Sequence, residues 1–96
     1  MLKIALTSKA ESDLYGIYEH YEPLLGAEAS EGVVFHIISA IEMLGTFSQL
    51  GKASDLPDCR ELIISKYPYR AVYSLIDKTI RIYRILHQRI ERAEDW

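Results

Sequence analysis

The last third of the chain alternates runs of β-branched and aromatic residues with short polar breaks. The runs cover residues 60–65, 69–76 and 79–87, and residues 66–68 and 77–78 separate them. Breaks of two or three residues are typical of β-hairpins. The pattern therefore predicts three strands, each antiparallel to its neighbour along the chain.

The first quarter of the chain combines a short predicted strand with a longer stretch of helical periodicity. A short apolar run at residues 2–6 is predicted to be a strand. Ser8 and Glu11 then have the spacing of a capping box, in which each side chain bonds a backbone N–H at a helix start. Pro23 and Gly26 are expected to end this helix. The apolar positions that recur at helical spacing are Ala10, Leu14, Ile17, Tyr18 and Tyr21.

A second helix is predicted at about residues 27–44, with Gly45 as its cap. Its apolar stripe is wide enough for one side of the helix to be buried. The stripe consists of Val33, Val34, Ile37, Ile38, Ile41 and Leu44. Because only a short loop separates the two helices, they should form an antiparallel hairpin.

These elements follow one another in the order β-α-α-β-β-β within a single domain, residues 1–96. Helices grouped early and strands grouped late predict an α+β fold, with the helical hairpin packed on one face of a small, mainly antiparallel sheet. Residues 47–57 are expected to be a loop, whose Phe47 and Leu50 tuck under the helical hairpin.

Composition narrows the class of protein. The chain has 96 residues, a net charge of −3 and one cysteine, Cys59. A lone cysteine allows no internal disulfide and favours a reducing, cytoplasmic location. No apolar run reaches the length of a membrane span, and the first residues do not have the pattern of a signal peptide.

Charge is distributed unevenly along the chain. Residues 1–50 carry two lysines against seven acids, a balance of −5, whereas residues 51–96 carry nine Lys/Arg against seven acids, a balance of +2. A protein that binds nucleic acid mainly through phosphates is normally basic overall. Strong direct binding to nucleic acid is therefore not expected.

Several kinds of catalytic site find no support in the sequence. No two of His20, His36 and His87 have the spacing of metal ligands, and Cys59 has no partner. No nucleophile motif, phosphate loop or dinucleotide fingerprint occurs. No metal and no cofactor are therefore expected.

RNA cleavage is the one enzymatic option that the residues leave open. It requires acid–base groups and positive charge at the phosphate. Arg60, Arg70 and Arg84 could supply the charge, and His87, or Glu61, the acid–base chemistry. Strand arginines are also common as solvated residues whose stems cover apolar neighbours. The sequence alone leaves both readings open.

A set of short segments, in a fixed order, resembles the RelE/ParE superfamily of bacterial toxins from toxin–antitoxin systems. The resemblance spans nearly the whole chain and implies the β-α-α-β-β-β fold. The segments are Ala10 with Asp13-Leu14 and Ile17-Tyr18, Leu50-Gly51, Arg60-Glu61-Leu62, residues 67–73 and residues 80–89.

Within that superfamily the chain is most similar to the ParE branch, the plasmid stabilisation proteins that poison DNA gyrase. The RelE branch consists of ribosome-dependent mRNA endonucleases, which are generally strongly basic and tend to carry a tyrosine in their final segment. This chain has a charge of −3, and residues 87–96 contain no tyrosine. The resemblance thus implies a toxin that acts by binding gyrase and is neutralised by a cognate antitoxin, with which it could form a hetero-oligomer.

Two sets of contact residues are expected in this interpretation, and no catalytic residue. The gyrase-contacting set is Arg60, Arg70, Arg84, His87, Arg89 and Trp96. The antitoxin-contacting set is Leu14, Tyr18, Tyr21 and Tyr73, because tyrosine is enriched at protein interfaces.

Two rival interpretations remain. In the first, the chain is a RelE-like mRNA endonuclease with Arg60, Arg70 and His87 as its catalytic residues. In the second, it is a non-toxic module that only binds antitoxins. Growth on induction without antitoxin, together with assays of gyrase inhibition and mRNA cleavage, separates the three.

Overall fold

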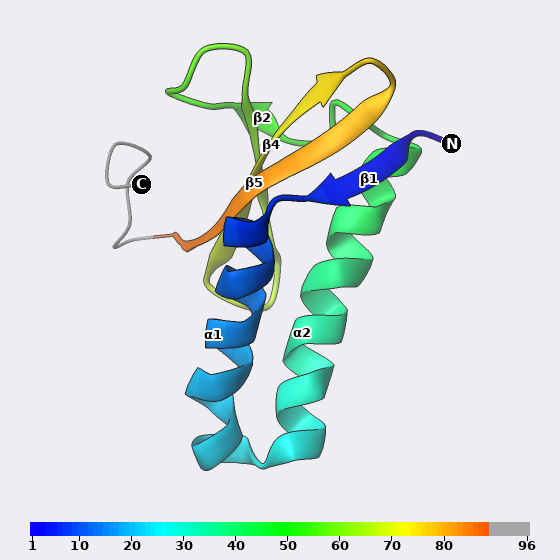
Figure 1. Cartoon of the computed structure of the whole chain (residues 1–96). Helices are drawn as coiled ribbons and strands as arrows, with labels where there is room; N and C mark the ends of the chain where they lie inside the picture. Colours follow the sequence, from blue (N-terminus) through cyan, green and yellow to red (C-terminus); the bar gives the residue numbers. More distant parts are fainter. Residues whose placement is uncertain (89–96) are drawn as a thin grey trace.

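The computed structural model describes residues 1–88, which form a helical hairpin on a five-stranded mixed sheet (Figure 1). The helices are α1 (Ser8–Leu25) and α2 (Ala27–Glu42), followed by the 3-10 turn η1 (Met43–Gly45). The strands are β1 (Lys3–Leu6), β2 (Lys52–Ala53), β3 (Arg60–Ile63), β4 (Tyr69–Ile76) and β5 (Thr79–His87). The predicted α+β class and hairpin-on-sheet arrangement are confirmed.

The strands lie in the order β1-β5-β4-β3-β2. The neighbours among β2 to β5 are antiparallel, whereas β1 runs parallel to β5, with Lys3 opposite Thr79 and Leu6 opposite Ile82. The chain can make this parallel pairing because both helices lie between β1 and the rest of the sheet in sequence. The two-residue strand β2 was not expected from the sequence, which indicated a loop there.

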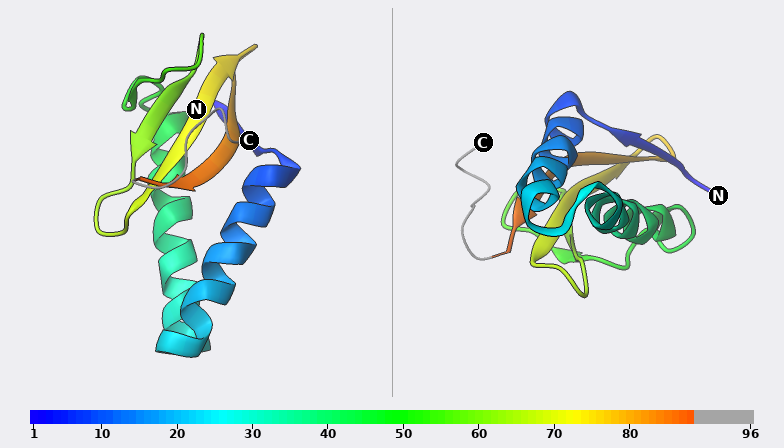
Figure 2. Two further views of the ribbon diagram at one scale, coloured as in Figure 1. Left: turned by 90° about the vertical axis from the view of Figure 1, so that its left-hand side faces the viewer. Right: turned by 90° about the horizontal axis from the view of Figure 1, so that it is seen from below.

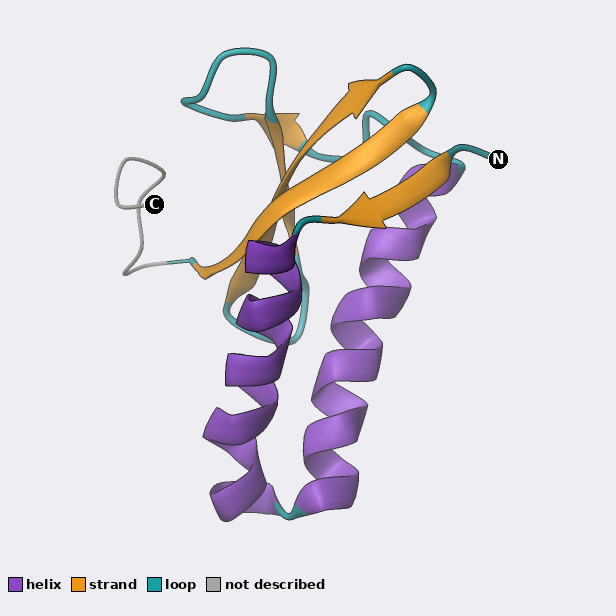
Figure 3. Cartoon of the chain, in the orientation of Figure 1, coloured by secondary structure: helices purple, strands orange, loops and turns teal. Residues whose placement is uncertain are grey.

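The helices cover one face of the sheet and project beyond it (Figures 2 and 3). The core lies between these two layers and includes Ile37, Ile41, Tyr73, Ile80 and Ile82, all at most 1% exposed. Neither helix in the described chain has both the length and the apolar character needed to span a bilayer.

The start of α1 differs from the predicted capping box by one residue. Thr7, rather than Ser8, is the N-cap, and its Oγ1 accepts a hydrogen bond from the Ala10 N–H at 3.1 Å. The same hydroxyl donates to the Tyr83 carbonyl at 2.8 Å. The cap therefore falls on Thr7, since this residue both begins the helix and ties it to β5.

The end of α1 also differs from the prediction. Pro23 lies inside the last turn, and the helix continues to Leu25. Proline removes one intrahelical hydrogen bond, but the Gly26 N–H donates to the Glu22 carbonyl at 2.8 Å and closes the turn. Gly26 has φ 89°, a conformation that glycine adopts without strain.

The predicted packing of Phe47 and Leu50 under the hairpin is wrong. Their side chains are 55% and 52% exposed. Gly51, next along the chain, is instead held against the sheet, because its N–H donates to the Tyr73 hydroxyl at 3.0 Å. This contact fixes the turn on the sheet and leaves the flanking apolar side chains in solvent.

Candidate partner-binding sites

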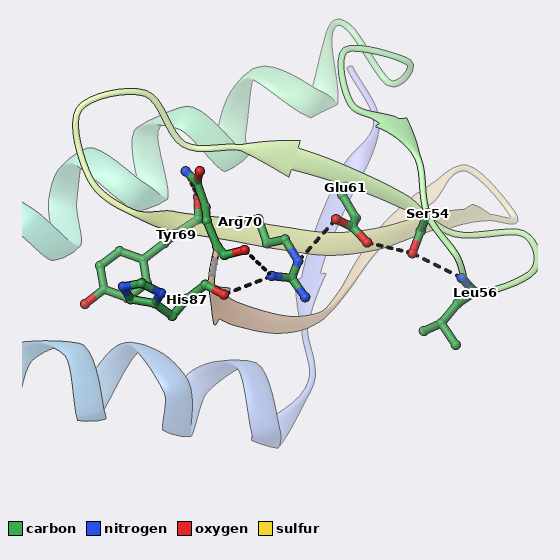
Figure 4. Close-up of polar contacts among 7 residues, drawn as sticks. Ser54, Leu56, Glu61, Tyr69, Arg70 and His87 are labelled. Atoms are coloured by element: carbon green, nitrogen blue, oxygen red, sulfur yellow. Dashed lines mark hydrogen bonds and ion pairs between the residues drawn. The ribbon is translucent and has the colours of Figure 1, made fainter. Parts of the chain in front are cut away.

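Among the predicted target-binding arginines within residues 1–88, Arg70 is the most buried, and it is bonded within the sheet. Its Nε lies 3.1 Å from Glu61 Oε1, and its Nη1 donates to the His87 carbonyl at 2.9 Å (Figure 4). Glu61 Oε2 in turn accepts from the Ser54 hydroxyl at 2.9 Å. Arg70 therefore joins three strands and a loop, and is only 8% exposed.

Arg60 is directed at the turn before β2. Its Nε donates to the Gly51 carbonyl at 2.8 Å, its Nη2 donates to the same oxygen, and Nη2 also reaches the Gln49 carbonyl at 3.3 Å. Tyr73 secures the same turn, since its hydroxyl donates to the Ser48 carbonyl at 2.8 Å. The Arg60 guanidinium thus donates to two backbone carbonyls of this turn.

Arg84 forms a bidentate ion pair with Asp13 of helix α1. Its Nε and Nη2 donate to the two Asp13 carboxylate oxygens at 2.8 and 2.9 Å. Asp13 Oδ2 also accepts the Ile85 N–H at 2.9 Å. Paired guanidinium–carboxylate bonds of this kind are strong and directional. The pair joins the first helix to the last strand.

His87 lies at the end of β5, half-buried, with its ring in a T-shaped contact with Tyr69 at 5.9 Å. It lines a cleft of about 370 Å³ between α1 and the sheet, together with Asp13 and His20. The structure thus brings the Arg70 guanidinium to the His87 backbone carbonyl, and it bonds Arg60, Arg70 and Arg84 to three different sets of acceptors. Arg89 and Trp96 lie outside the described residues.

An apolar groove lies between α1 and α2. It has a volume of about 750 Å³ and begins at Leu6 of β1. Three residues that line it are exposed: Tyr15 and Phe35 at 70%, and Ile38 at 37%. Such large apolar side chains gathered on one surface are typical of a protein-binding site. The groove is lined by Leu6, Glu11, Leu14, Tyr15, Tyr18, Glu31, Val34, Phe35 and Ile38.

The four residues of the predicted antitoxin set occupy different environments. Leu14 and Tyr18 both line the α1/α2 groove. Tyr21 is half-buried and packs towards Tyr67, with ring centroids 6.4 Å apart. Tyr73 is fully buried, and its hydroxyl accepts a hydrogen bond from the Gly51 N–H. It offers no surface to a partner in this conformation and is left out of the proposal below.

The groove residues Tyr15, Phe35 and Ile38 were not singled out from the sequence as contact residues. A signal was nevertheless present, because apolar residues cover more of the circumference of α2 than one buried face needs. Val33, Ile37 and Ile41 are buried, whereas Phe35 and Ile38 point away from the core. An excess of apolar positions on a helix therefore indicated a second contact surface.

Two further features bear on chemistry. Within residues 1–88 no group of three or more His, Cys, Asp or Glu side chains is arranged to hold a metal ion. Burial raises the pKa of the Cys59 thiol, and the neighbouring Asp58 carboxylate raises it further. A thiol with a raised pKa is a poor nucleophile at neutral pH.

Comparison with known proteins decides the family. The model of the ParE toxin of type II toxin–antitoxin systems, parDE, matches residues 4–92. The chain belongs to this ParE toxin family. A structure of the chromosomal ParDE system from P. aeruginosa matches with a TM-score of 0.84 and 31% identity, over 91% of this chain and 96% of that one.

RelE structures share the fold of this ParE-type toxin at lower identity. The RelBE toxin–antitoxin complex of E. coli matches with a TM-score of 0.64 and 17% identity, over 96% of this chain and all of that one. The isolated E. coli RelE toxin matches at 0.56 and 15%, over 99% and 93% of the two chains. No curated protein sequence matches. The resemblance to the RelE/ParE superfamily is thus confirmed.

Proposed function

We propose that this ParE-type toxin inhibits DNA gyrase by binding it, and that a cognate antitoxin neutralises it by placing an amphipathic helix in the α1/α2 groove. Membership of the ParE family supports the first part. The single observation that carries the second is the groove itself, with Tyr15 and Phe35 exposed beside the apolar side chains of Leu14 and Val34. An amphipathic helix binds such a groove with its apolar face.

Inhibition by binding, rather than RNA cleavage, fits the environment of the arginines. A nuclease needs cationic side chains directed at the phosphate that gains charge. The guanidinium groups of Arg60 and Arg70 are directed at backbone carbonyls and at Glu61 instead. Redirecting Arg70 to a phosphate would leave the Glu61 carboxylate without this cation in a largely buried position, which is costly.

The proposal is tested with the purified toxin and with its antitoxin. Active toxin should block supercoiling by gyrase or increase the amount of cleaved DNA, and transcripts on translating ribosomes should stay intact. Cleaved transcripts with unimpaired gyrase would favour the nuclease. Normal growth on strong induction without antitoxin would favour a module that binds antitoxins and is not toxic.

Binding of the antitoxin should also raise the thermal stability of the toxin. A partner that binds only the folded state stabilises it by about 2.7 kcal/mol at a free concentration 100 times its Kd. Phe35→Ser should lessen this gain, because it removes an exposed apolar side chain from the groove wall. Equal melting of free and saturated toxin would contradict the proposed complex.

A further inference from the structure

The sheet face opposite the helices gathers cations that make no ion pair within residues 1–88. Ile80 and Ile82 of β5 belong to the core on the helix side. Successive side chains of a strand alternate between faces, so Arg81 lies on the opposite face, where it is exposed. We call this face the outer face.

Strand register places two more lysines near Arg81. Ala5 of β1 is opposite Arg81 of β5, and Lys3, two residues before Ala5, is opposite Thr79. Lys3 and Arg81 therefore lie on the same face of neighbouring strands. The Lys3 N–H donates to the Lys78 carbonyl at 3.3 Å, which brings the β4–β5 turn to the same corner. Figure 1 shows the start of β1 and this turn at one end of the sheet.

A cleft of about 950 Å³ lies beside β4, and the outer-face residues Ser74, Ile76 and Tyr83 are part of its lining. Ser74, the cross-strand partner of Arg81, lines it, and its hydroxyl lies 2.9 Å from the Tyr83 hydroxyl. Ile76 lines the same cleft at 43% exposure and lies on the outer face, because its cross-strand partner is Thr79. The outer face therefore combines cations, hydroxyl groups and an exposed apolar side chain.

The composition of the cleft favours a protein over a nucleic acid as the occupant. Asp55 and Asp58 also line it and would repel a phosphate backbone. The chain as a whole carries a charge of −3, which also opposes binding to nucleic acid. A protein surface can present carboxylates to the cations and an apolar side chain to Ile76.

We propose that the outer face, defined by Lys3, Lys78, Arg81, Ile76 and Tyr83, is the surface with which this toxin binds its target protein. The matching surface carries carboxylates around an apolar side chain. The identity of the target as gyrase rests on the function proposed above, whereas the location of the surface does not. The outer face and the α1/α2 groove lie on opposite sides of the sheet, so loss of one interaction can be measured while the other is kept.

The test compares three substitutions of exposed cations. Arg81→Glu reverses the charge on the outer face, and Arg81→Lys keeps it. Lys66→Glu makes the same change of charge in the turn at the other end of β4. Purified gyrase is the probe. Arg81→Glu should require about tenfold more toxin for half-inhibition of supercoiling, and Arg81→Lys and Lys66→Glu less than about twofold more.

Each variant is first compared with wild type in thermal unfolding, and Ile76→Ser provides a second, uncharged disruption of the outer face. Unchanged inhibition by both Arg81→Glu and Ile76→Ser, with wild-type melting, overturns the proposal. Equal impairment by Lys66→Glu overturns it too, because the effect would then be one of net charge. Binding of a DNA duplex by the toxin alone, lost in Arg81→Glu, would assign the face to nucleic acid instead.

Failure of the gyrase proposal is distinguishable from failure of this one. If wild-type toxin does not inhibit gyrase, the same variants are compared by growth arrest on induction. Relief of arrest by Arg81→Glu, with arrest maintained by Lys66→Glu, supports the outer face with a different target protein. Arrest by Arg81→Glu at the wild-type level overturns it.

Discussion

The helical hairpin and the sheet use their residues in opposite ways. In the hairpin, large apolar side chains such as Tyr15 and Phe35 remain 70% exposed. In the sheet, the guanidinium groups of Arg60, Arg70 and Arg84 donate hydrogen bonds to carbonyls and carboxylates of the protein itself. The side chains usually associated with a core are thus available to a partner, and those usually associated with a binding surface hold the fold together.

This difference shows that residue type alone does not indicate which surface of the molecule binds a partner. An arginine on a strand is available to a partner only if its guanidinium is not already bonded to a carbonyl or carboxylate of the same chain. Arg84 meets Asp13 across 71 residues of sequence, and Arg70 meets Glu61 from the neighbouring strand. Four substitutions, from the largest expected effect to the smallest, test whether the two regions differ as described.

The largest effect is expected for Asp13→Ala. The substitution removes the acceptor of two Arg84 hydrogen bonds and of the Ile85 N–H. Loss of one partner of a largely buried charge pair should lower the free energy of unfolding by roughly 3 kcal/mol. Urea unfolding measures it. Glu19→Ala, at an exposed position of the same helix, is the control and should change stability by less than about 0.5 kcal/mol. Equal effects of the two would mean that the ion pair does not hold α1 to β5.

Gly51→Ala should have the next largest effect. A Cβ at this position would lie 2.7 Å from the Glu61 carbonyl oxygen and 2.8 Å from the Tyr73 ring. Overpacking of this kind costs about 1–3 kcal/mol, measurable as a lower unfolding midpoint. Gly32→Ala is the matched control. Its Cβ would meet nothing within 4 Å on α2, so the exchange should stabilise by up to about 1 kcal/mol. A neutral Gly51→Ala would show that the turn can move away from the sheet.

Phe35→Ser tests the hairpin side of the comparison. Because Phe35 is 70% exposed, its loss should change the stability of the free toxin by less than about 0.5 kcal/mol. Affinity for the antitoxin should fall about tenfold, as for removal of an apolar contact worth about 1.4 kcal/mol. Calorimetric titration measures this. Leu50→Ser removes an exposed apolar residue outside the groove and should leave affinity unchanged. A similar loss of affinity in both variants would place the antitoxin elsewhere.

The smallest effect concerns the Cys59 thiol, which lines the cleft of about 950 Å³ beside β4. The raised pKa of Cys59 means less thiolate at pH 8, so alkylation by iodoacetamide should be slower than for an unstructured cysteine peptide. Asp58→Asn removes the nearby negative charge and should accelerate the reaction, although burial still keeps it below the peptide rate. An unchanged rate in Asp58→Asn would mean that burial alone raises the pKa.

Much of the fold could be predicted because it depends on local patterns. The runs that became β4 and β5 have the bounds that the polar breaks indicated, since a two-residue connection leaves little choice of register. The helical hairpin followed from apolar spacing in the same way. The cap at Thr7 and the exposed Phe47 and Leu50 could not be predicted, because contacts with Tyr83 and Tyr73 far along the chain decide them.

The candidate sites were predictable only in part. Tyrosine content selected Tyr18 of α1, which lines the groove, and also Tyr73, which is buried. Both are aromatic residues in apolar runs, and nothing local distinguishes them. The difference arises because Tyr73 faces the helix layer at the centre of the sheet, whereas Tyr18 faces the open side of the hairpin.

The sequence by itself determined the order of helices and strands, the acidic first half, and the resemblance that the ParE family match confirms. These depend on spacing, composition and short motifs, which are local. Only the tertiary structure decided that Arg60, Arg70 and Arg84 are bonded within the protein while Arg81 is exposed. The physical reason is that a guanidinium bonds whichever oxygen the fold brings within about 3 Å, and those oxygens come from distant parts of the chain.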